Sequence, residues 1–357
     1  MGEPKSKVRV LFATASTTGG GAERMLFNII RSLDDNHDIR LFVTSTDRVP
    51  LQASDKFSAV NACKTHAISA FGQLLRTLKQ FKPHHVFTTS SNVGYMLVLA
   101  KKILRAKFKI FIRCAVTPSE IYHSDIKNRL LNQIIRITYN DADLIIAQTD
   151  FMRDDLIKSY HIRPDKVRTI RNIVDKQFVE SQSGEYVATE LRLSTFNIVA
   201  AGALYSVKGF DLLVDAIAPI MGANPAVMLY ILGEERYEAG YKDFLAEKIK
   251  SYGLQQRIHL LGHKSNPYPY LKGADLFVMS SRKEGFPNVV LEALTLGTPV
   301  VATRCVDFTG TIEDGVNGYV VDCDVESIRN GLNSAINSGF DRMSTDLINF
   351  DYNQLFD

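Results

Sequence analysis

Two glutamates, Glu284 and Glu292, stand eight positions apart in the segment Ser280–Ala293. They flank an expected strand-to-helix junction, with the loop Glu284–Asn288 in between. The Glu284 carboxylate and the N–H groups of such a loop can bind a sugar. The Glu292 carboxylate, one turn into the helix, can accept hydrogen bonds from both hydroxyls of a ribose. Asn288 is expected to cap that helix. A chance pair of surface acids is the alternative, which we rank lower because these residues follow a strand, where open α/β sheets bind ligands.

A lysine with similar placement occurs earlier, in the segment Gly202–Asp211. Gly202 ends an expected strand, and Lys208 stands at the start of the next helix. A lysine in this position can neutralise a pyrophosphate leaving group. The alternative is an ordinary surface lysine, and the pair Lys208-Gly209 alone does not decide between them.

A glycine-rich turn, Gly19–Gly21, lies between the first expected strand and the first expected helix. Glycines let the backbone approach a ligand closely, and a helix N-terminus offers unpaired N–H groups to an anion. The turn matches neither the dinucleotide-binding pattern nor the phosphate-binding loop of nucleotide hydrolases. A tight strand-to-helix turn without a ligand is an equal alternative.

Short β-branched runs that alternate with amphipathic stretches must position these residues. Strands are predicted at Val8–Thr14, Ile39–Ser45, Val86–Ser90, Lys109–Ala115, Leu144–Thr149, Val167–Arg171, Asn197–Ala203, Val227–Gly233, Arg257–Gly262, Leu276–Ser280, Pro299–Thr303 and Gly318–Val321. Helices are predicted near Ala22–Leu33, Gly72–Phe81, Val93–Leu104, Ile126–Tyr139, Phe151–Tyr160, Phe210–Met221, Tyr241–Tyr252, Val289–Leu296 and Val325–Asn337. Strand–helix alternation predicts parallel sheets covered on both faces. Twelve strands exceed one doubly wound sheet, so two such domains are expected.

The boundary between the domains is expected within Lys176–Ser194, where the chain is polar and lacks periodicity. The last residues, Phe350–Asp357, are too few for a domain and are expected to pack back on the first one. No apolar run approaches the roughly 18–20 residues of a membrane-spanning helix, and no secretory signal is recognised.

The charge is distributed unevenly. Residues 1–180 hold 28 Lys and Arg against 17 Asp and Glu, whereas residues 181–357 hold 14 against 22. A basic first half favours anionic partners: a membrane surface, a pyrophosphate-linked lipid or nucleic acid. A solvated face without a partner is an equal alternative. Nucleic acid is not expected as a partner, because no recognition motif accompanies the charge.

The motifs together resemble glycosyltransferase family 4. Glu284 and Glu292 are similar to the E-x7-E element of that family. The surrounding segments also follow the family pattern: Gly20–Glu23, Asn172–Asp175, Asn266–Leu271, Gly273–Leu276, Glu284–Asn288, Glu292–Leu294, Gly297–Ala302 and Asp314–Gly318. The resemblance covers nearly the whole chain and is strongest over residues 256–320.

The resemblance implies an α/β fold of the GT-B type, with two doubly wound Rossmann-like domains facing across a cleft. Residues 1–180 would bind the acceptor, with the tail 340–357 packed back on them, and residues 190–338 would bind a nucleotide-sugar, with UDP favoured over GDP. No cofactor and no metal are expected.

The resemblance also implies roles for individual residues. Lys208 would stabilise the departing pyrophosphate, Glu284 would hold the donor sugar and Glu292 the ribose, while the base would lie near Gly233 and His263. Lys208 and Glu284 are the catalytic candidates. The donor-binding candidates are Gly20, Gly21, Gly202, Lys208, Gly233, His263, Glu284, Gly285, Phe286, Pro287, Asn288, Val289 and Glu292.

Two departures from the family pattern concern catalysis. The family often has arginine where Ala203 stands, and a histidine near Cys114 and Ala115. Losing one phosphate-binding cation costs on the order of 10²–10³ in rate. Arg113 and Glu23 are candidates for the acceptor side. Candidates to replace the histidine are Arg113, His66, His84 and His123, although a structural or solvated role is the simpler expectation for each histidine.

The function these features predict is a retaining glycosyltransferase that elongates a glycan or a polyprenyl-pyrophosphate-linked acceptor in cell-surface polysaccharide, lipopolysaccharide or glycoconjugate synthesis. It is expected in the cytoplasm, peripheral on the inner face of the membrane. Retention fits the lack of an obvious general base, because the leaving phosphate can take the proton of the acceptor. The alternatives are a binding subunit of weak or no activity, motivated by Ala203 and the absent histidine, and a sugar-nucleotide epimerase on the same fold.

Overall fold

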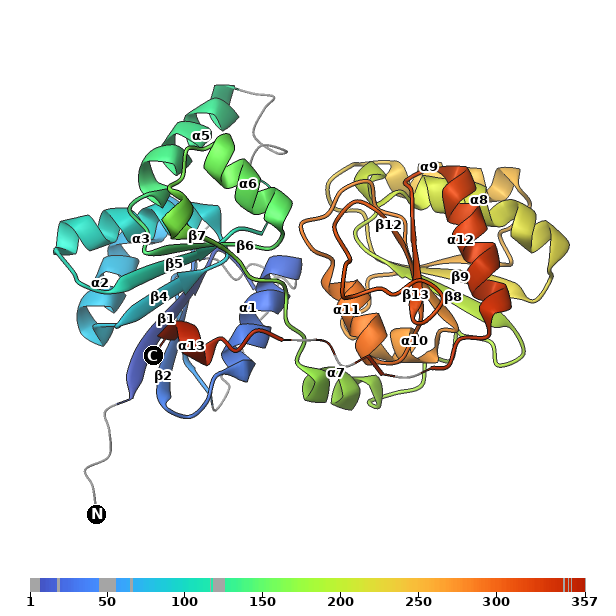
Figure 1. Ribbon diagram of the computed structural model, residues 1–357, viewed down its shortest axis with the longest axis horizontal. Coiled ribbons are helices and arrows are strands. Elements are labelled where there is room, and N and C mark those ends of the chain that lie inside the picture. The colour runs from blue at the N-terminus through green and yellow to red at the C-terminus, as the bar shows by residue number, and fades with distance from the viewer. Residues whose placement is uncertain are drawn as a thin grey trace, which may run out of the picture. The chain divides into compact units, whose positions relative to one another are not determined.

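The computed structural model of the protein describes residues 7–17, 20–44, 56–64, 67–115, 117, 126–342, 344–345, 347 and 349–356. The chain divides into two compact units (Figure 1). The first unit comprises Met1–Ile173 and Asn349–Asp357, and the second comprises Val174–Ile348.

The first unit contains a seven-stranded parallel sheet in the order β3-β2-β1-β4-β5-β6-β7. Its strands are β1 (Val8–Thr14), β2 (His37–Val43), β3 (Ser58–Asn61), β4 (His85–Thr88), β5 (Lys109–Arg113), β6 (Leu144–Ala147) and β7 (Val167–Thr169). The chain order reverses between β1 and β4. That point, at the carboxyl ends of the strands, is where doubly wound sheets bind ligands.

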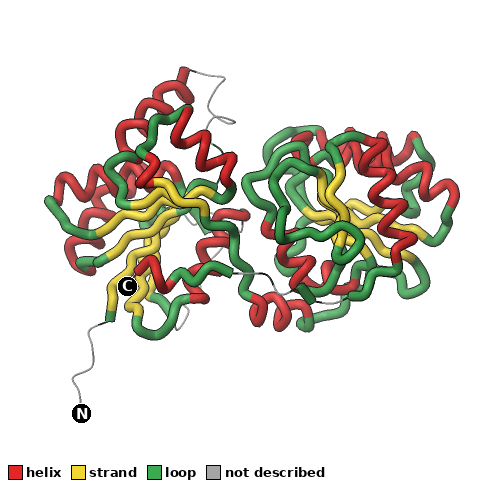
Figure 2. Tube along the Cα trace, viewed as in Figure 1, coloured by secondary structure: helices red, strands yellow, loops and turns green. Residues whose placement is uncertain are grey.

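Helices pack on both faces of this sheet (Figure 2). They are α1 (Gly21–Ser32), α2 (Phe71–Phe81), α3 (Ser91–Leu104), α5 (Ile126–Tyr139), α6 (Asp150–Lys158) and α13 (Asn353–Phe356), with short 3-10 turns η1 (Ala67–Ala70) and η2 (Pro164–Lys166). One buried cluster joins the sheet to α2, α3, α5 and α6, and another joins it to α1 and α13. Burying apolar side chains on both faces is what parallel sheets require.

The second unit contains a six-stranded parallel sheet in the order β10-β9-β8-β11-β12-β13. Its strands are β8 (Phe196–Ala201), β9 (Val227–Leu232), β10 (Ile258–Gly262), β11 (Leu276–Met279), β12 (Val300–Thr303) and β13 (Gly318–Val321). Here the chain order reverses between β8 and β11, so the loops that follow these two strands are neighbours. Lys208 and Glu284 lie in those loops.

Two sets of helices cover the second sheet (Figure 1). They are α7 (Lys176–Ser183), α8 (Phe210–Ala223), α9 (Tyr241–Ser251), α10 (Tyr268–Gly273), α11 (Asn288–Thr295) and α12 (Val325–Ser338), with the 3-10 turn η3 (Ser206–Lys208). The helices α8, α9 and α12 share one buried cluster with the sheet, and α7, α10 and α11 share the other. The fold class predicted from the sequence, α/β with two doubly wound sheets, is confirmed.

The segment Lys176–Ser194, in which the boundary was expected, contacts the second unit. Its helix α7 packs on α10 and α11, and the contacts divide the chain between Ile173 and Val174. The C-terminal residues Tyr352 and Phe356 are fully buried in the first unit, between β strands and α1.

Candidate functional site

Lys208 and Glu284 form an ion pair at the carboxyl edge of the second sheet. The Lys208 Nζ lies 2.5 Å from the Glu284 Oε1, and their side chains are 19% and 15% exposed. Ser281, at the end of β11, donates a second hydrogen bond to the same Glu284 oxygen at 2.7 Å. The two candidate catalytic residues are therefore in direct contact although 76 positions separate them.

The pairing keeps the lysine cationic. Burial alone would lower the pKa of Lys208, but the adjacent Glu284 carboxylate outweighs burial and holds that pKa above its ordinary value. A half-buried cation held ready for negative charge is the element that electrostatic stabilisation of a leaving phosphate requires.

Glycine at position 209 allows the two loops to meet. Gly209 has a φ of +62°, and a Cβ at this position would lie 2.0 Å from the Ser280 carbonyl oxygen. The Ser280 hydroxyl also donates to the Lys208 carbonyl oxygen at 2.9 Å. Any side chain at 209 would push the Lys208 loop away from the β11 loop, and with it Lys208 from Glu284.

The ends of β8, β9 and β10 approach each other just as closely. Gly233 has a φ of +147°, and its Cβ would lie 1.8 Å from the Gly202 carbonyl oxygen. The Gly233 N–H donates to the Gly262 carbonyl oxygen at 2.8 Å. A Cβ on Gly202 would lie 3.3 Å from the Lys208 side chain. The ends of β8 and β9 are therefore packed too closely for a side chain at Gly233.

Arg282 is a positioning residue that sequence reasoning missed. Its guanidinium makes two parallel bonds to Asp211, at 2.8 and 2.7 Å, and donates to the Ser206 carbonyl oxygen at 2.5 Å. Burial opposes ionisation of Asp211, but Arg282 and the Tyr241 hydroxyl lower the pKa of Asp211 below its ordinary value. The bidentate pair ties the loop after β11 to the first turn of α8, so it fixes the distance between Lys208 and Glu284.

Helix α11 carries Glu292, which is 1% exposed. The Tyr268 hydroxyl from α10 donates to its Oε1 at 3.3 Å. The expectation that Asn288 caps this helix is wrong. The chain enters α11 one residue earlier than expected, so Pro287 is the N-cap residue, and its side chain makes no capping hydrogen bond.

The other donor-side candidates fall at the same edge. His263 follows β10 and is exposed, whereas Phe286 is 6% exposed and packs its ring 6.0 Å from that of Phe308. Gly285 and Val289 are half-buried, and Pro287 is buried. The packing of Phe286 anchors the loop that presents Glu284.

The first unit presents its glycine-rich turn at the carboxyl end of β1. Gly20 is the N-cap residue of α1, and Gly21 is the first helical residue; Gly19 lies outside the described residues. A Cβ on Gly20 would lie 2.5 Å from the Glu23 carboxylate, which accepts a hydrogen bond from the Ser16 hydroxyl at 2.9 Å. Glycine here makes room for Glu23 over the start of its own helix.

Arg113, the other acceptor-side candidate, is 1% exposed at the carboxyl end of β5. Its guanidinium donates to the Asn172 Oδ1. This burial gives Arg113 a structural role in the first unit, and contact with an acceptor stays a prediction.

His84 does not replace the missing histidine. It precedes β4 and accepts a hydrogen bond from the Arg9 N–H at 3.0 Å, so it lies at the amino edge of the sheet. Cys114 follows β5 at the opposite, carboxyl edge, because the strands are parallel. His66 and His123 lie outside the described residues.

Within the described ranges, no group of three or more His, Cys, Asp or Glu could hold a metal ion. In the same residues, no helix is long and apolar enough to cross a membrane.

Two parallel, doubly wound sheets in one chain are the architecture of the GT-B fold, and solved structures of this fold match the chain. HepE from Anabaena, solved in complex with UDP and glucose, matches with a TM-score of 0.75 at 20% identity, over 92% of this chain and 89% of that one. WaaG, a glycosyltransferase involved in lipopolysaccharide biosynthesis, matches with a TM-score of 0.69 at 16% identity, over 92% and 90%.

Family models match both halves of the sequence. The model described as Glycosyltransferase Family 4 matches residues 19–178, and that described as Glycosyl transferases group 1 matches residues 195–338. The chain belongs to glycosyltransferase family 4.

Two curated relatives illustrate the family. An uncharacterized glycosyltransferase of Methanocaldococcus jannaschii is 29% identical over 65% of this chain and 58% of its own length, which is less than two thirds. N-acetylgalactosamine-N,N'-diacetylbacillosaminyl-diphospho-undecaprenol 4-alpha-N-acetylgalactosaminyltransferase of Campylobacter jejuni is 27% identical over 81% of this chain and 78% of its own length.

Proposed function

We propose that this protein transfers a sugar from a nucleotide-sugar, with UDP favoured over GDP, to a lipid-linked or glycan acceptor, with retention of anomeric configuration and without a catalytic metal. The observation that carries the proposal is the Lys208–Glu284 pair at the reversal point of the second sheet. Family membership gives this pair its chemical context, and the solved complex of HepE with UDP and glucose supports the choice of UDP.

The proposed step breaks the bond between the anomeric carbon and the β-phosphate of the donor. Lys208 neutralises charge on the departing diphosphate, and Glu284 accepts hydrogen bonds from the hydroxyls of the sugar. The acceptor hydroxyl attacks from the side the phosphate leaves, and a phosphate oxygen takes its proton. Lys208 is bound to Glu284 in the structure, so a diphosphate must compete with Glu284 for the ammonium.

A polyprenyl-pyrophosphate-linked acceptor is the finer proposal. It is supported by the printed name of the Campylobacter relative, which is a transferase acting on a diphospho-undecaprenol glycan. The basic first half of the chain suits an anionic acceptor and a peripheral position on the inner face of the membrane. In this proposal the positive charge of the first half accounts for binding of the acceptor and for attachment to the membrane, without a membrane-spanning segment.

Calorimetric titration with UDP, GDP and ADP in EDTA tests the donor site first. We expect UDP to bind with micromolar affinity, and Glu292→Gln to weaken it at least tenfold, since a ribose contact is lost. Glu326→Gln, at an exposed acid in the first turn of α12, is the matched control. A melting curve of Glu292→Gln separates loss of binding from loss of folding, because Glu292 is buried.

Transfer itself is tested by incubating UDP-sugars with an undecaprenyl-diphosphate-linked glycan and following UDP release. The anomeric signal of the product in proton NMR reports retention or inversion. If UDP binds but no acceptor leads to release of UDP from a UDP-sugar, the binding-subunit alternative is favoured, which Ala203 and the absent histidine motivate.

A further inference from the structure

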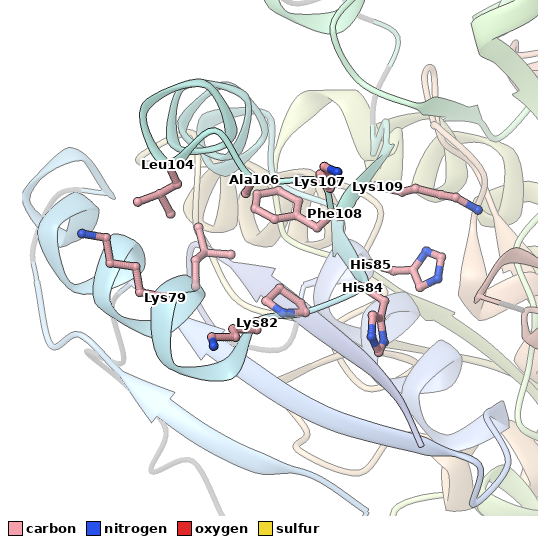
Figure 3. Close-up of a pocket in the computed structure, with 11 residues that line it drawn as sticks. Lys79, Lys82, His84, His85, Leu104, Ala106, Lys107, Phe108 and Lys109 are labelled. Carbon is pink, nitrogen blue, oxygen red and sulfur yellow. The ribbon is translucent and has the colours of Figure 1, made fainter. Parts of the chain in front are cut away.

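The first unit has a pocket at the amino ends of β4 and β5, the edge of the sheet opposite to the glycine-rich turn (Figure 3). Its volume is about 530 Å³, within the range of small-molecule sites. It lies where the last turn of α2, the last turn of α3 and the starts of the two strands meet. The lining residues are Leu78, Lys79, Lys82, Pro83, His84, His85, Leu104, Ala106, Lys107, Phe108 and Lys109.

The charge of the pocket is of one sign. Four lysines and two histidines line it, and no acid does. Among the residues that the structure describes, no ion pair engages Lys79, Lys82, Lys107 or Lys109. All four are exposed. Unpaired lysines around one hollow produce a local positive potential that draws anions.

Nearby acids are already occupied. Asp143 pairs with Lys101 at 2.8 Å and Asp141 with Lys102 at 2.6 Å, and neither acid lines the pocket. Of the basic run that the sequence shows at residues 101–109, two lysines are therefore neutralised by neighbours. The other two, Lys107 and Lys109, face the pocket without compensation.

The floor of the pocket is apolar. Leu78 and Phe108 are 3% and 5% exposed, and Leu104 from the end of α3 is half-buried beside them. In Figure 3 the side chains of Ala106 and Phe108 lie between those of Lys79 and Lys109. A free phosphate would pair with the lysines but leave the apolar floor exposed to water. The pocket therefore suits a ligand with an anionic end and an apolar body.

Helix α3 also carries exposed aliphatic side chains that do not line the pocket. Ile103, the neighbour of Leu104, is 56% exposed, and Leu99, one turn earlier on the same face of α3, is 49% exposed. Residues at this spacing lie side by side on a helix. Exposed aliphatic side chains of this size offer a surface on which a hydrocarbon chain can lie.

From these features we propose that the pocket binds a phosphate-bearing amphiphile, with the phosphate among Lys79, Lys82, Lys107 and Lys109 and the hydrocarbon on Leu104 and Phe108. This site is separate from the nucleotide-sugar site of the proposed function. The phosphate can belong to an anionic phospholipid of a bilayer or to a soluble phosphorylated compound with an apolar body.

The test uses three probes on the full chain. Dihexanoyl phosphatidylglycerol below its micellar concentration represents the soluble amphiphile, glycerophosphoglycerol represents its head group alone, and phosphatidylglycerol vesicles represent the bilayer, with phosphatidylcholine vesicles as the neutral reference. We expect saturable binding of the short-chain lipid, much weaker binding of the head group, and binding to phosphatidylglycerol vesicles that falls as salt rises.

Charge is tested with the triple variant Lys79→Gln/Lys82→Gln/Lys107→Gln. Each lysine removed near an anionic surface lowers binding by roughly fivefold, so vesicle binding should fall by on the order of 100-fold. The matched control is Lys242→Gln/Lys250→Gln/Lys272→Gln, three exposed lysines of the second unit. Equal losses in both triples would show attraction by net charge alone and would overturn the proposal.

The apolar floor is tested with Leu104→Gln, which changes no charge. This variant should weaken binding of the short-chain lipid by roughly fivefold to tenfold, while its affinity for glycerophosphoglycerol stays unchanged. Unchanged UDP binding shows in each variant that the chain is folded and separates this result from the proposed function. If only vesicles bind, and Leu104→Gln has no effect on them, the pocket is not the site.

Discussion

The two basic regions of this molecule are built on opposite principles. At the carboxyl edge of the second sheet a single lysine, Lys208, is 19% exposed and held 2.5 Å from a carboxylate. At the amino edge of the first sheet, four exposed lysines surround a pocket that no acid lines. In the first arrangement an ion pair holds one charge in one place, whereas in the second the positive potential comes from four exposed lysines together.

The difference predicts different chemistry. A fixed, desolvated cation acts on charge that develops at one atom, and its effect depends on geometry. Exposed lysines act through their combined field, which salt screens within about 10 Å. The first region is therefore suited to catalysis and the second to holding an anionic ligand. The variants below test each half of this comparison, from the largest expected effect to the smallest.

Lys208→Ala should have the largest effect. Removing the cation that faces the leaving diphosphate is expected to lower kcat by on the order of 10²–10³, with a smaller change in KM. The measurement is UDP release with saturating donor and acceptor. Lys283→Ala, an exposed lysine in the same loop as Glu284, is the matched control and should change kcat less than twofold. Equal losses in both variants would mean that Lys208 has no special position.

Gly209→Ala tests whether the fixed geometry depends on the backbone. The new Cβ would meet the Ser280 carbonyl oxygen at 2.0 Å in a left-handed conformation, so we expect a loss of about 2–3 kcal/mol in the free energy of unfolding. Gly222→Ala is the control: it lies in α8 with no atom near its Cβ and should stabilise by about 0.5–1 kcal/mol. Denaturant unfolding measures both, and a neutral Gly209→Ala would contradict the packing described.

Much of this fixed region could be predicted from the sequence. The strand pattern placed Gly202, Lys208, Glu284 and Glu292 at strand ends or one turn beyond, and all twelve predicted strands form. Local sequence patterns do not show which side chains form ion pairs with each other in the fold. The Arg282–Asp211 pair joins positions 71 apart, and no periodicity shows which acid an arginine will reach.

The elements that were missed have physical reasons too. The edge strand β3 has only four residues, Ser58–Asn61, with two exposed positions, so it shows no apolar run. Helix α10 has Pro267 as its N-cap residue and contains Pro269, and these prolines disguise a helical turn. Helix α7 is polar, so the sequence pattern predicts a linker there. Its first turn is nevertheless capped, because the Asp175 side chain accepts a hydrogen bond from the Phe178 N–H at 3.0 Å.

Ala203→Arg asks whether one fixed cation is enough. Ala203 is half-buried in the loop between Gly202 and Lys208, so an arginine there would reach the same phosphates. We expect UDP binding to tighten by on the order of tenfold, the effect of about one added charge-assisted hydrogen bond. Calorimetry measures the affinity, and UDP release measures turnover. Intact UDP binding without turnover in either form would favour a binding subunit.

The smallest expected effect concerns His85, a buried residue of the amino-edge pocket. Its ring stacks on Phe111 at 5.6 Å and meets Phe356 edge-on at 5.8 Å. Burial lowers its pKa from 6.5 to about 4, and Lys109, His84 and His37 add to the lowering while Asp143 opposes it. Because the folded state holds the proton more weakly than the unfolded state, stability is full above about pH 6.5 and falls as the pH drops toward 4.

As the pH falls from about 6.5 to 4, we expect His85 to lower the free energy of unfolding by roughly 1–2 kcal/mol. This is less than the whole pKa shift would give, because the pocket is open to solvent. NMR titration of the ring protons should give a midpoint near pH 4, and His85→Gln should lose less stability than the wild type between pH 7 and pH 4.5. His161→Gln, a surface histidine, should behave as the wild type does. A bound phosphate would raise the His85 midpoint, because an anion favours the protonated ring. If glycerophosphoglycerol and the short-chain lipid both leave this midpoint unmoved, no phosphate binds in the pocket, and the comparison of the two basic regions would then rest on their architecture alone.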